Sequence, residues 1–377
     1  MKVALVHDWL TSMRGGEKVL EIFCSLFPDA TIHTLIHQKG NLSPALEGMN
    51  IVESRLHSWP LAHDHFRIYL PFFPRLIEKF DFDGFDLVLS SSHCVAKGVK
   101  VPDHIPHICY CHTPMRYVWD MYEEYKRERG PLAKAFLALN KKPLRSWDVK
   151  TSDRVNYYIA NSEHVANRIN RHYGKSSTVI HPPVDTEFYS PGDGIDEDYY
   201  LIVSALVPYK KVGMAVRAFS GSGKKLYVIG TGSDEDRIRR LDGPDVTFLG
   251  NVEDELLREY YRGAKALIFP GEEDFGITPL ESMACGRPVI AFAKGGALET
   301  VVEGKTGHFF KEPTSKALMA AVDNFERMSF TVTSVRERAL EFSKSIFMNK
   351  IKEFIDARMK EFSGEIKGAQ SSKQNTE

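Results

Sequence analysis

Residues 266–281 of this chain read Ala266-Leu-Ile-Phe-Pro-Gly-Glu-Glu-Asp-Phe-Gly-Ile-Thr-Pro-Leu-Glu281 and are the most informative part of its sequence. It begins with a short apolar run, Ala266–Phe269, that ends at a proline and a glycine, which is typical of a buried parallel strand. A helix is predicted at Pro279–Cys285, so the acidic loop lies between the end of a strand and the start of a helix. This succession indicates a parallel α/β sheet, in which ligands bind beyond the carboxyl ends of the strands.

The same unit of strand, loop and helix repeats on both sides of this stretch. Further apolar runs predict strands at Tyr200–Leu206, Lys225–Ile229, Val246–Leu249, Val289–Phe292 and Gly307–Phe310. Helices are expected between them at Val212–Phe219, Asp254–Tyr261, Ala297–Val302 and Ser315–Arg327. The alternation predicts a doubly wound, Rossmann-like sheet in the C-terminal half of the chain.

The N-terminal half shows the same alternation. Its apolar runs predict strands at Val3–Trp9, Thr31–Ile36, Asp86–Ser90, His107–Cys111, Asn156–Ala160 and Ser177–Ile180. A chain of 377 residues is long enough for two domains, each with its own core. The predicted fold class is therefore α/β, with two doubly wound parallel sheets facing each other across a cleft. The domains are placed at residues 1–188 and 199–345.

The segments outside these two domains have compositions of their own. Residues 189–198 are acidic and rich in glycine and proline, which indicates a linker. After the second domain, apolar side chains recur at helical spacing, at Phe347, Ile351, Phe354, Ile355, Met359 and Phe362. This stripe predicts a helix over 346–362 that packs back onto the N-terminal domain. The polar tail, 363–377, is expected to be disordered.

The overall composition excludes several classes of function. The net charge is -1, so nucleic acid is not an expected partner. No run approaches the ~18 apolar residues of a membrane span, and the N-terminus begins with a strand rather than a signal peptide. Five scattered cysteines argue for a reducing compartment, so we expect a cytoplasmic protein. A metal is not expected, because no second Cys/His pair accompanies Cys109 and Cys111 at zinc-binding spacing.

The acidic loop carries two carboxylates, Glu273 on the loop and Glu281 inside the following helix. A carboxylate accepts hydrogen bonds from hydroxyl groups, which suits a sugar or a ribose. The backbone N–H groups of Phe275, Gly276 and Ile277 lie at the helix start and suit an anion such as phosphate. The residues alone leave an equal alternative, because solvated acidic loops and acidic first turns of helices are common.

The loop Glu273-Asp-Phe-Gly-Ile-Thr-Pro-Leu-Glu281 resembles the signature of GT-B glycosyltransferase family 4, whose members transfer sugars from nucleotide donors with retention at the anomeric carbon. The likeness continues at Ser204-Ala-Leu-Val-Pro-Tyr-Lys210, Gly230-Thr-Gly232, Phe248-Leu-Gly-Asn-Val252 and Gly295-Gly-Ala-Leu-Glu299. In the N-terminal half, Gly15-Gly-Glu17, Tyr110-Cys-His112-Thr-Pro114 and His181-Pro-Pro-Val-Asp185 are similar to the WbaZ-like mannosyltransferases of that family. The resemblance covers the chain except for its tail.

The resemblance implies a role for each matching residue. Glu273 would hold hydroxyls of the transferred sugar, Glu281 would hold the ribose, and Lys210 would neutralise the diphosphate as the glycosidic bond breaks. His112 would lie near the sugar and the acceptor. The other donor-binding residues implied are Phe275, Gly276, Ile277, Gly15, Gly16, Gly230, Asn251 and Val252. Many family members have an arginine where this chain has Ala205, so the second cation on the diphosphate stays open.

The implied activity is that of a retaining hexosyltransferase that needs no metal and no cofactor. GDP-mannose is the implied donor, and a glycan or polyprenyl-diphosphate-linked sugar in cell-envelope polysaccharide synthesis is the implied acceptor. A UDP-sugar such as UDP-glucose or UDP-GlcNAc is the alternative donor. A nucleotide-dependent oxidoreductase is a more remote alternative, because Gly230-Thr-Gly232-Ser-Asp-Glu235 has glutamate where the dinucleotide fingerprint needs its third glycine.

Two stretches of the N-terminal domain mix aromatic and basic residues, as surfaces that rest at a bilayer interface do. The first spans residues 59–80 and includes Phe66, Phe72 and Phe73, and the second holds Lys141, Lys142, Arg145 and Trp147. The residues alone favour ordinary core aromatics with solvated charges. The resemblance implies a lipid-linked acceptor, which favours peripheral contact with the inner face of the cytoplasmic membrane.

Overall fold

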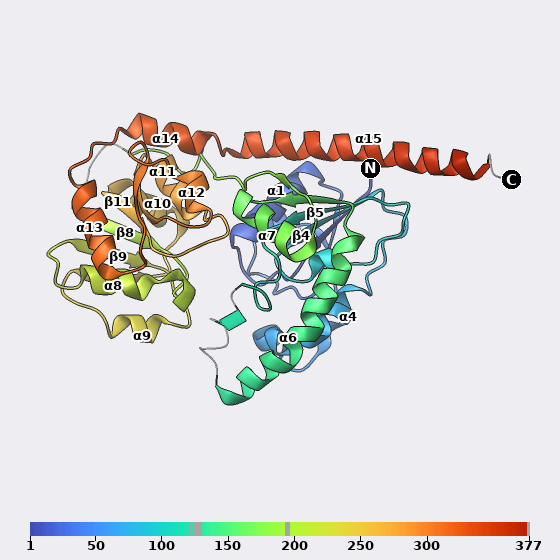
Figure 1. The fold of residues 1–377 in the computed structure, drawn as a ribbon, viewed down its shortest axis with the longest axis horizontal. Helices are drawn as coiled ribbons and strands as arrows, with labels where there is room; N and C mark the ends of the chain where they lie inside the picture. Colours follow the sequence, from blue (N-terminus) through green and yellow to red (C-terminus); the bar gives the residue numbers. More distant parts are fainter. Residues whose placement is uncertain (121, 124–129, 193–196, 375–377) are drawn as a thin grey trace. The chain divides into compact units, whose positions relative to one another are not determined.

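The computed structural model describes residues 1–120, 122–123, 130–192 and 197–374 (Figure 1). The chain divides into two compact units: unit 1 is Met1–Ile180 with the chain from Met348 onward, and unit 2 is His181–Phe347. Each unit contains a parallel sheet, so the two doubly wound sheets predicted from the sequence are confirmed. Unit 2 begins at His181, before the linker that was predicted at residues 189–198. Residues 193–196 of that linker lie outside the described part.

The described strands of unit 1 form a parallel sheet in the order β3-β2-β1-β4-β5-β6-β7. Their bounds are β1 Val3–His7, β2 Thr31–Thr34, β3 Asn50–Glu53, β4 Leu87–Ser92, β5 His107–Cys111, β6 Tyr157–Ala160 and β7 Thr178–Val179. The sequence did not predict β3, because its residues alternate between exposed and half-buried at the sheet edge and form no apolar run.

Helices and short 3-10 turns connect these strands. The described helices are α1 Gly15–Leu26, α2 Pro44–Glu47, α3 Ala62–His65, α4 Phe73–Ile77, α6 Pro131–Thr151 and α7 Glu163–Tyr173. The 3-10 turns are η1 Arg55–Ser58, η2 Phe66–Phe72, η3 Ala96–Gly98 and η4 Ser152–Arg154. Helix α7 begins after Ser162 because this residue caps it: the Ser162 hydroxyl accepts a hydrogen bond from Val165 N–H at 3.0 Å.

The C-terminal helix α15, Lys344–Gln374, continues past the end that was predicted at Phe362. Ile351 and Ile355 of the predicted apolar stripe are buried, and the Arg358 guanidinium lies 5.3 Å from the Tyr157 ring of β6. Residues 363–374 were expected to be disordered, whereas the structure makes them helical. No proline interrupts that segment, so the helical hydrogen bonds can continue through it. Residues 375–377 lie outside the described part.

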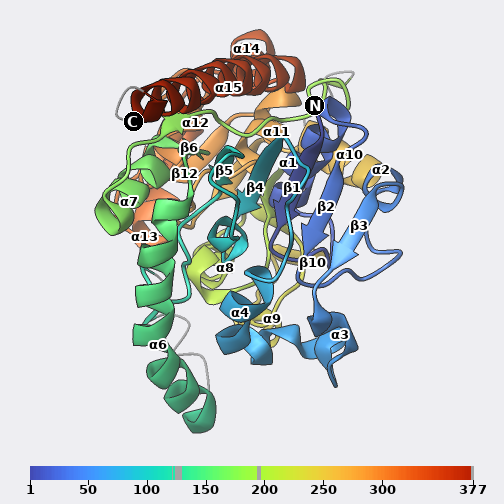
Figure 2. The same cartoon turned by 90° about the vertical axis from the view of Figure 1, so that its right-hand side faces the viewer.

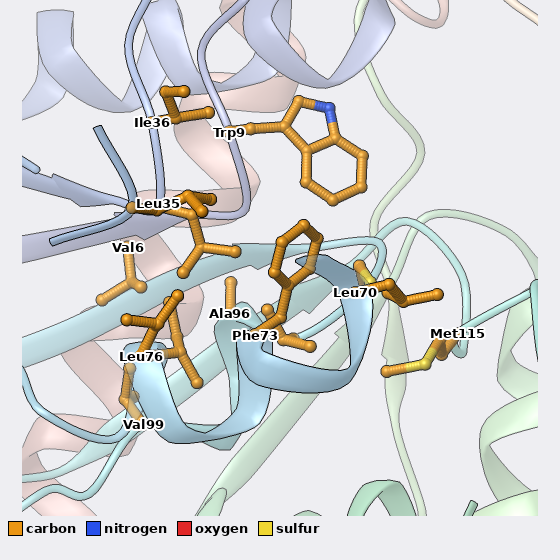
Figure 3. Close-up of a cluster of buried hydrophobic side chains, with 14 of the residues drawn as sticks. Val6, Trp9, Leu35, Ile36, Leu70, Phe73, Leu76, Ala96, Val99 and Met115 are labelled. Atoms are coloured by element: carbon orange, nitrogen blue, oxygen red, sulfur yellow. The ribbon is translucent and has the colours of Figure 1, made fainter. Parts of the chain in front are cut away.

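One face of the unit 1 sheet packs on a core of aliphatic and aromatic side chains (Figure 3). Trp9 packs against Phe66 with ring centroids 5.2 Å apart, and Phe73 is fully buried beside them. Much of the aromatic stretch 59–80 is therefore interior rather than available to a membrane. Phe72 differs, because 45% of it is exposed.

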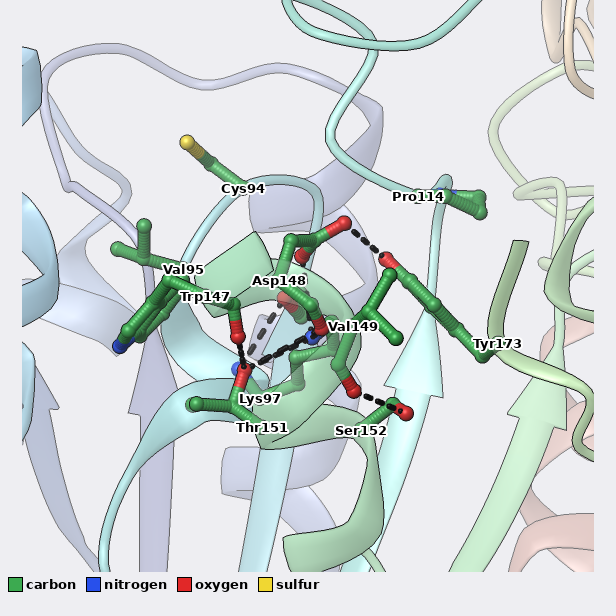
Figure 4. A network of polar contacts seen from close by, with 12 residues as sticks. Cys94, Val95, Lys97, Pro114, Trp147, Asp148, Val149, Thr151, Ser152 and Tyr173 are labelled. Carbon is green, nitrogen blue, oxygen red and sulfur yellow. Dashed lines mark hydrogen bonds and ion pairs between the residues drawn. The ribbon is translucent and has the colours of Figure 1, made fainter. Parts of the chain in front are cut away.

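A buried polar network ties α6 to this core (Figure 4). The Lys97 ammonium is buried in η3, donates to the Asp148 carbonyl oxygen at 2.6 Å and pairs with Asp148 Oδ1 at 3.0 Å. Asp148 Oδ2 accepts from Trp119 Nε1 at 2.7 Å and from the Tyr173 hydroxyl at 2.8 Å. Three other segments of unit 1, at Lys97, Trp119 and Tyr173, therefore converge on one buried carboxylate in the C-terminal part of α6.

The described strands of unit 2 form a six-stranded parallel sheet in the order β10-β9-β8-β11-β12-β13. Their bounds are β8 Tyr199–Val203, β9 Lys225–Ile229, β10 Val246–Gly250, β11 Ala266–Phe269, β12 Val289–Phe292 and β13 Gly307–Phe310. Strand β11 has the predicted bounds because proline and glycine end its apolar run at once.

The helices of unit 2 alternate with these strands. They are α8 Val212–Phe219, α9 Glu235–Arg239, α10 Asp254–Gly263, α11 Thr278–Ala284, α12 Ala297–Thr300, α13 Ser315–Phe325 and α14 Val332–Leu340, with the turn η5 Pro208–Lys210. The sequence did not predict α14, because only Val335 and Ala339 of that helix are buried and no apolar stripe marks it.

In both sheets the strand order reverses once, between β1 and β4 in unit 1 (Figure 2) and between β8 and β11 in unit 2. At such a switch point the connections leave toward opposite faces of the sheet, so the loops part beyond the carboxyl ends of the two strands. Functional residues are therefore expected on the loops that follow β1, β4, β8 and β11.

Candidate functional site

The switch point of unit 2 brings together two residues that the sequence assigned to the site. Lys210 ends η5 after β8, and Glu273 lies in the loop after β11. The Lys210 ammonium and the Glu273 carboxylate form an ion pair, and both side chains are only partly exposed to solvent. A cation and a carboxylate at this position can bind the anionic part and the hydroxyl groups of one ligand.

Backbone contacts hold the Glu273 loop in place independently of its side chain. The Glu273 carbonyl oxygen accepts from Gly296 N–H at 2.9 Å. A Cβ at Gly295 would lie 2.3 Å from that oxygen, and φ there is +63°, so the position requires glycine. A Cβ at Gly271 would lie 2.9 Å from Lys210 Cα. The loops after β8, β11 and β12 are therefore packed backbone to backbone beneath the ion pair.

Glu281 lies inside α11, and only 4% of it is exposed. Its Oε2 accepts from the Tyr261 hydroxyl of α10 at 2.9 Å. Burial and the charge of Glu281 raise the pKa of the Tyr261 hydroxyl well above its usual range, so this hydroxyl keeps its proton and stays a donor. One oxygen of the carboxylate that was predicted to hold a ribose is therefore engaged within unit 2.

The residues predicted to offer backbone N–H groups lie just before α11, for which Ile277 is the N-cap. The Phe275 side chain is buried and stacks on the His181 ring at a centroid distance of 5.3 Å. His181 Nε2 in turn lies 2.9 Å from Glu299 Oε2. The Phe275 side chain thus contributes to packing, and its backbone is the part that can meet a ligand.

The remaining predicted residues of unit 2 lie near the carboxyl ends of β9, β10 and β11. Gly230 follows β9, and a Cβ there would lie 2.1 Å from the Ser204 carbonyl oxygen, so packing alone explains this glycine. Asn251 and Val252 follow β10 directly. A Cβ at Gly276 would lie 2.6 Å from the aromatic ring that ends β11. All of these residues therefore lie on loops at one edge of the sheet.

The switch point of unit 1 gathers His112, Gly15 and Gly16. His112 directly follows β5, and its Nε2 lies 2.8 Å from the Ser91 hydroxyl of β4. The same hydroxyl lies 3.1 Å from Nδ1 of His7, the last residue of β1. Gly16 faces both rings, because a Cβ there would lie 3.5 Å from His7 Cε1 and 3.7 Å from His112 Nε2. Gly15 begins α1 and leaves open space on its Cβ side.

Glu17 contributes a buried carboxylate to this cluster. Its Oε1 lies 3.7 Å from His7 Nε2, and its Oε2 accepts from Arg14 N–H at 3.1 Å at the start of α1. Burial raises the pKa of Glu17, but the neighbouring His7, the charge of His93 and a backbone hydrogen bond together outweigh burial and hold that pKa below its usual value. We therefore treat Glu17 as a carboxylate at neutral pH.

Asp8 supplies a second buried carboxylate, with a structural task. It accepts from the four backbone N–H groups of residues 93–96, which fixes the turn after β4. Its Oδ2 also lies 3.1 Å from Nδ1 of His93. Burial and the charge of His7 lower the pKa of His93 to about 3, so this imidazole is neutral at physiological pH.

The sequence singled out His112 and the two glycines as candidates but not the polar side chains that lie beside them. His7, Ser91 and His93 lie at or just beyond the ends of β1 and β4. Polar side chains in the last positions of otherwise apolar strands are the signal that could have found them, because those positions reach the carboxyl edge of the sheet.

Metal sites and membrane spans each require a recognisable arrangement of residues in the part of the chain that the structure describes. Within it, no group of three or more His, Cys, Asp or Glu side chains is arranged to hold a metal ion. None of its helices combines the length and the apolarity that crossing a membrane takes.

Solved structures share this architecture. HepE of Anabaena, in complex with UDP-glucose, has a TM-score of 0.70 at 16% identity, covering 94% of this chain and 99% of that one. Sucrose-phosphate synthase from Thermosynechococcus elongatus has a TM-score of 0.71 at 16% identity, covering 95% and 98%. Two parallel-sheet units of this kind are the GT-B fold, which confirms the predicted fold class.

Two family models match the sequence, one in each half of the chain. Residues 21–188 match the model described as Glycosyltransferase Family 4, and residues 185–342 match the model described as Glycosyl transferases group 1. The fold and these two matches together place the chain among the GT-B glycosyltransferases.

Curated relatives match over part of their length. The D-inositol 3-phosphate glycosyltransferase of Kribbella flavida is 30% identical over 192 residues, covering 42% of this chain and 45% of that protein. The Alpha-1,3/1,6-mannosyltransferase ALG2 of Dictyostelium discoideum is 31% identical over 170 residues, covering 38% and 40%. The chain thus spans less than half the length of these relatives, and they differ in the reaction that their names state.

Proposed function

We propose that this chain is a retaining hexosyltransferase that moves a sugar from a nucleotide-sugar donor to a glycan or polyprenyl-diphosphate-linked acceptor in cell-envelope polysaccharide synthesis. The Lys210–Glu273 ion pair at the switch point of unit 2 carries this proposal. A nucleotide sugar has a diphosphate beside a ring of hydroxyl groups, and an ammonium beside a carboxylate matches that pair of groups.

In the proposed reaction, the bond between the anomeric carbon and the diphosphate oxygen breaks while the acceptor oxygen bonds to the same face of that carbon. The departing diphosphate oxygen takes the proton of the acceptor hydroxyl. Lys210 stabilises the negative charge that grows on the diphosphate. Glu273 holds sugar hydroxyls, and its pairing with an ammonium favours this binding role over that of a nucleophile. Retention follows from attack on the same face.

The other proposed contacts follow the loops of the two sheets. Glu281 holds the ribose, and the backbones of Phe275, Gly276 and Ile277 face the phosphates. Gly230, Asn251 and Val252 are proposed beside the nucleotide, Gly15 and Gly16 beside the diphosphate, and His112 beside the sugar and the acceptor. Ala205 is exposed and offers no second cation. Lys211 does not replace it directly, because its ammonium lies 5.0 Å from the Phe292 ring.

GDP-mannose is the donor we propose, in keeping with a relative named as a mannosyltransferase. The alternative is a UDP-sugar, since the HepE structure holds UDP-glucose. A nucleotide that binds the folded state at 100 times its Kd adds about 2.7 kcal/mol of stability. We therefore expect GDP to raise Tm more than UDP does in a thermal-shift screen. The opposite order would exclude the mannose assignment.

We also propose that the reaction needs no metal, so activity should be unchanged in EDTA. Activity that is lost in EDTA but restored by Mg²⁺ would exclude metal independence.

Peripheral membrane contact through unit 1 is part of the same proposal, because a polyprenyl-linked acceptor lies in a bilayer. Helix α6 carries exposed apolar side chains, with Leu139 77% exposed and Phe136 near it, among the basic residues Lys134 and Lys142. We expect the protein to float with anionic vesicles and Leu139→Asp to weaken that binding. Leu256→Asp, at an exposed leucine of α10, is the matched control and should bind as wild type does. No flotation of the wild type would contradict membrane contact.

A further inference from the structure

Ser91 shares one hydroxyl group between two histidines at the switch point of unit 1. The residue is fully buried, and its Oγ lies 3.1 Å from His7 Nδ1 and 2.8 Å from His112 Nε2. A serine hydroxyl carries a single hydrogen, so it can donate to only one of these nitrogens and has to accept from the other. The protonation of His7 therefore decides which role is left for His112.

Glu17 faces the other ring nitrogen of His7. The Glu17 carboxylate lies 3.7 Å from His7 Nε2, and both side chains are shielded from solvent. A buried carboxylate without a countercharge is costly, whereas an imidazolium beside it leaves the pair neutral. An imidazolium at His7 would donate its Nδ1–H to Ser91 and so direct the Ser91 hydrogen to Nε2 of His112.

We propose that Glu17, through its ion pair with His7, and the His7–Ser91 hydrogen bond form a chain that holds His112 neutral, with Nε2 as an acceptor and the ring proton on Nδ1. The inference rests on the proposed function, in which His112 lies beside the sugar and the acceptor. The other three are positioning residues, because they act through His112. Adding a proton to Nε2 would leave the Ser91 hydrogen without an acceptor and place a second charge close to His7, so the chain opposes that step.

Other titratable groups surround this chain without replacing Glu17. The His93 ring centroid lies 5.8 Å from that of His7 and 6.5 Å from that of His112, and the Tyr110 ring lies 5.1 Å from His112. The Asp8 carboxylate is engaged by backbone N–H groups and by His93. Two further charges, those of Arg67 and Arg116, help to lower the pKa of His93. Glu17 is thus the carboxylate that faces His7.

The test is nuclear magnetic resonance on the full-length protein with ¹⁵N-labelled histidine. We expect neutral His112 in the wild type to carry its proton on Nδ1, and Ser91→Ala to abolish that preference. Glu17→Gln keeps an oxygen for the Arg14 N–H and removes the charge that favours an imidazolium at His7, so we expect the pKa of His112 to rise. The acidic limb of the pH profile of kcat/KM should move to higher pH by the same amount.

Ser90→Ala is the matched control. Ser90 is equally buried, and its hydroxyl lies 2.8 Å from Nε2 of a different histidine, His107. This variant should alter the signals of His107 and leave those of His112 unchanged. A wild-type His112 with its proton on Nε2, or a Glu17→Gln variant with an unshifted His112 titration, overturns the inference. If the spectra behave as expected but no nucleotide sugar is turned over, the inference stands and the proposed function fails.

Discussion

Glu273→Gln should lower kcat by about 10²–10³ and leave the Kd for the nucleoside diphosphate within about threefold of wild type. Glutamine keeps the size of the side chain and one acceptor oxygen, but it removes the charge that pairs with Lys210 and would hold the sugar hydroxyls. The hydrogen bond from Gly296 to the loop uses a backbone carbonyl and is unaffected. Steady-state kinetics with calorimetric titration of the diphosphate measures both quantities. A fall in Tm that parallels the loss of kcat would show that Glu273 is structural.

Glu281→Gln is the variant that distinguishes the proposed role of Glu281 from that of Glu273. Glu281 is assigned to the ribose, so this variant should raise the donor KM by about tenfold while kcat stays near wild type. The buried contact with Tyr261 complicates the comparison, since a loss could come from packing. Tyr261→Phe removes that hydrogen bond and leaves the carboxylate in place. If Tyr261→Phe raises KM as much as Glu281→Gln does, Glu281 acts through packing and not through the ribose.

The meeting of Lys210 with Glu273 in unit 2 could be predicted from the sequence because the signals there are local. The run Ala266–Phe269, the glycines and the acidic residues lie within one loop, and the meeting of Lys210 with Glu273 follows from two loops at neighbouring strands. The parallel alternation of strands and helices is enough to place both at the same sheet edge.

Contacts between distant residues could not be predicted in the same way. His7 and Ser91 are 84 residues apart, and Lys97 and Asp148 are 51 apart. Periodicity indicates that β1 and β4 exist, but not that they are neighbours or in which register they pair. A change of register by one residue would turn Ser91 to the opposite face of the sheet, away from His7. The helical tail was missed for another reason, because low apolar content is typical of both disordered and exposed helical segments.

Lys97→Met should destabilise unit 1 by about 3–5 kcal/mol. The substitution leaves the Asp148 carboxylate buried with its hydrogen-bond donors but without a countercharge. That loss is a large part of the 5–15 kcal/mol by which typical proteins are stable. Urea unfolding followed by tryptophan fluorescence measures it for unit 1 alone, because all four tryptophans, Trp9, Trp59, Trp119 and Trp147, lie in that unit.

The double variant Lys97→Met with Asp148→Asn tests whether the charge pair itself is responsible. Asparagine keeps an oxygen for Trp119 and Tyr173 but carries no charge, so the double variant should cost about 2 kcal/mol less than the sum of the single variants. Lys100→Met is the control: its ammonium is exposed and lies 3.6 Å from Glu78, so its loss should change stability by no more than about 0.5 kcal/mol. Additive single variants would mean that the network stabilises unit 1 through packing around Lys97 and Asp148, independently of their charges.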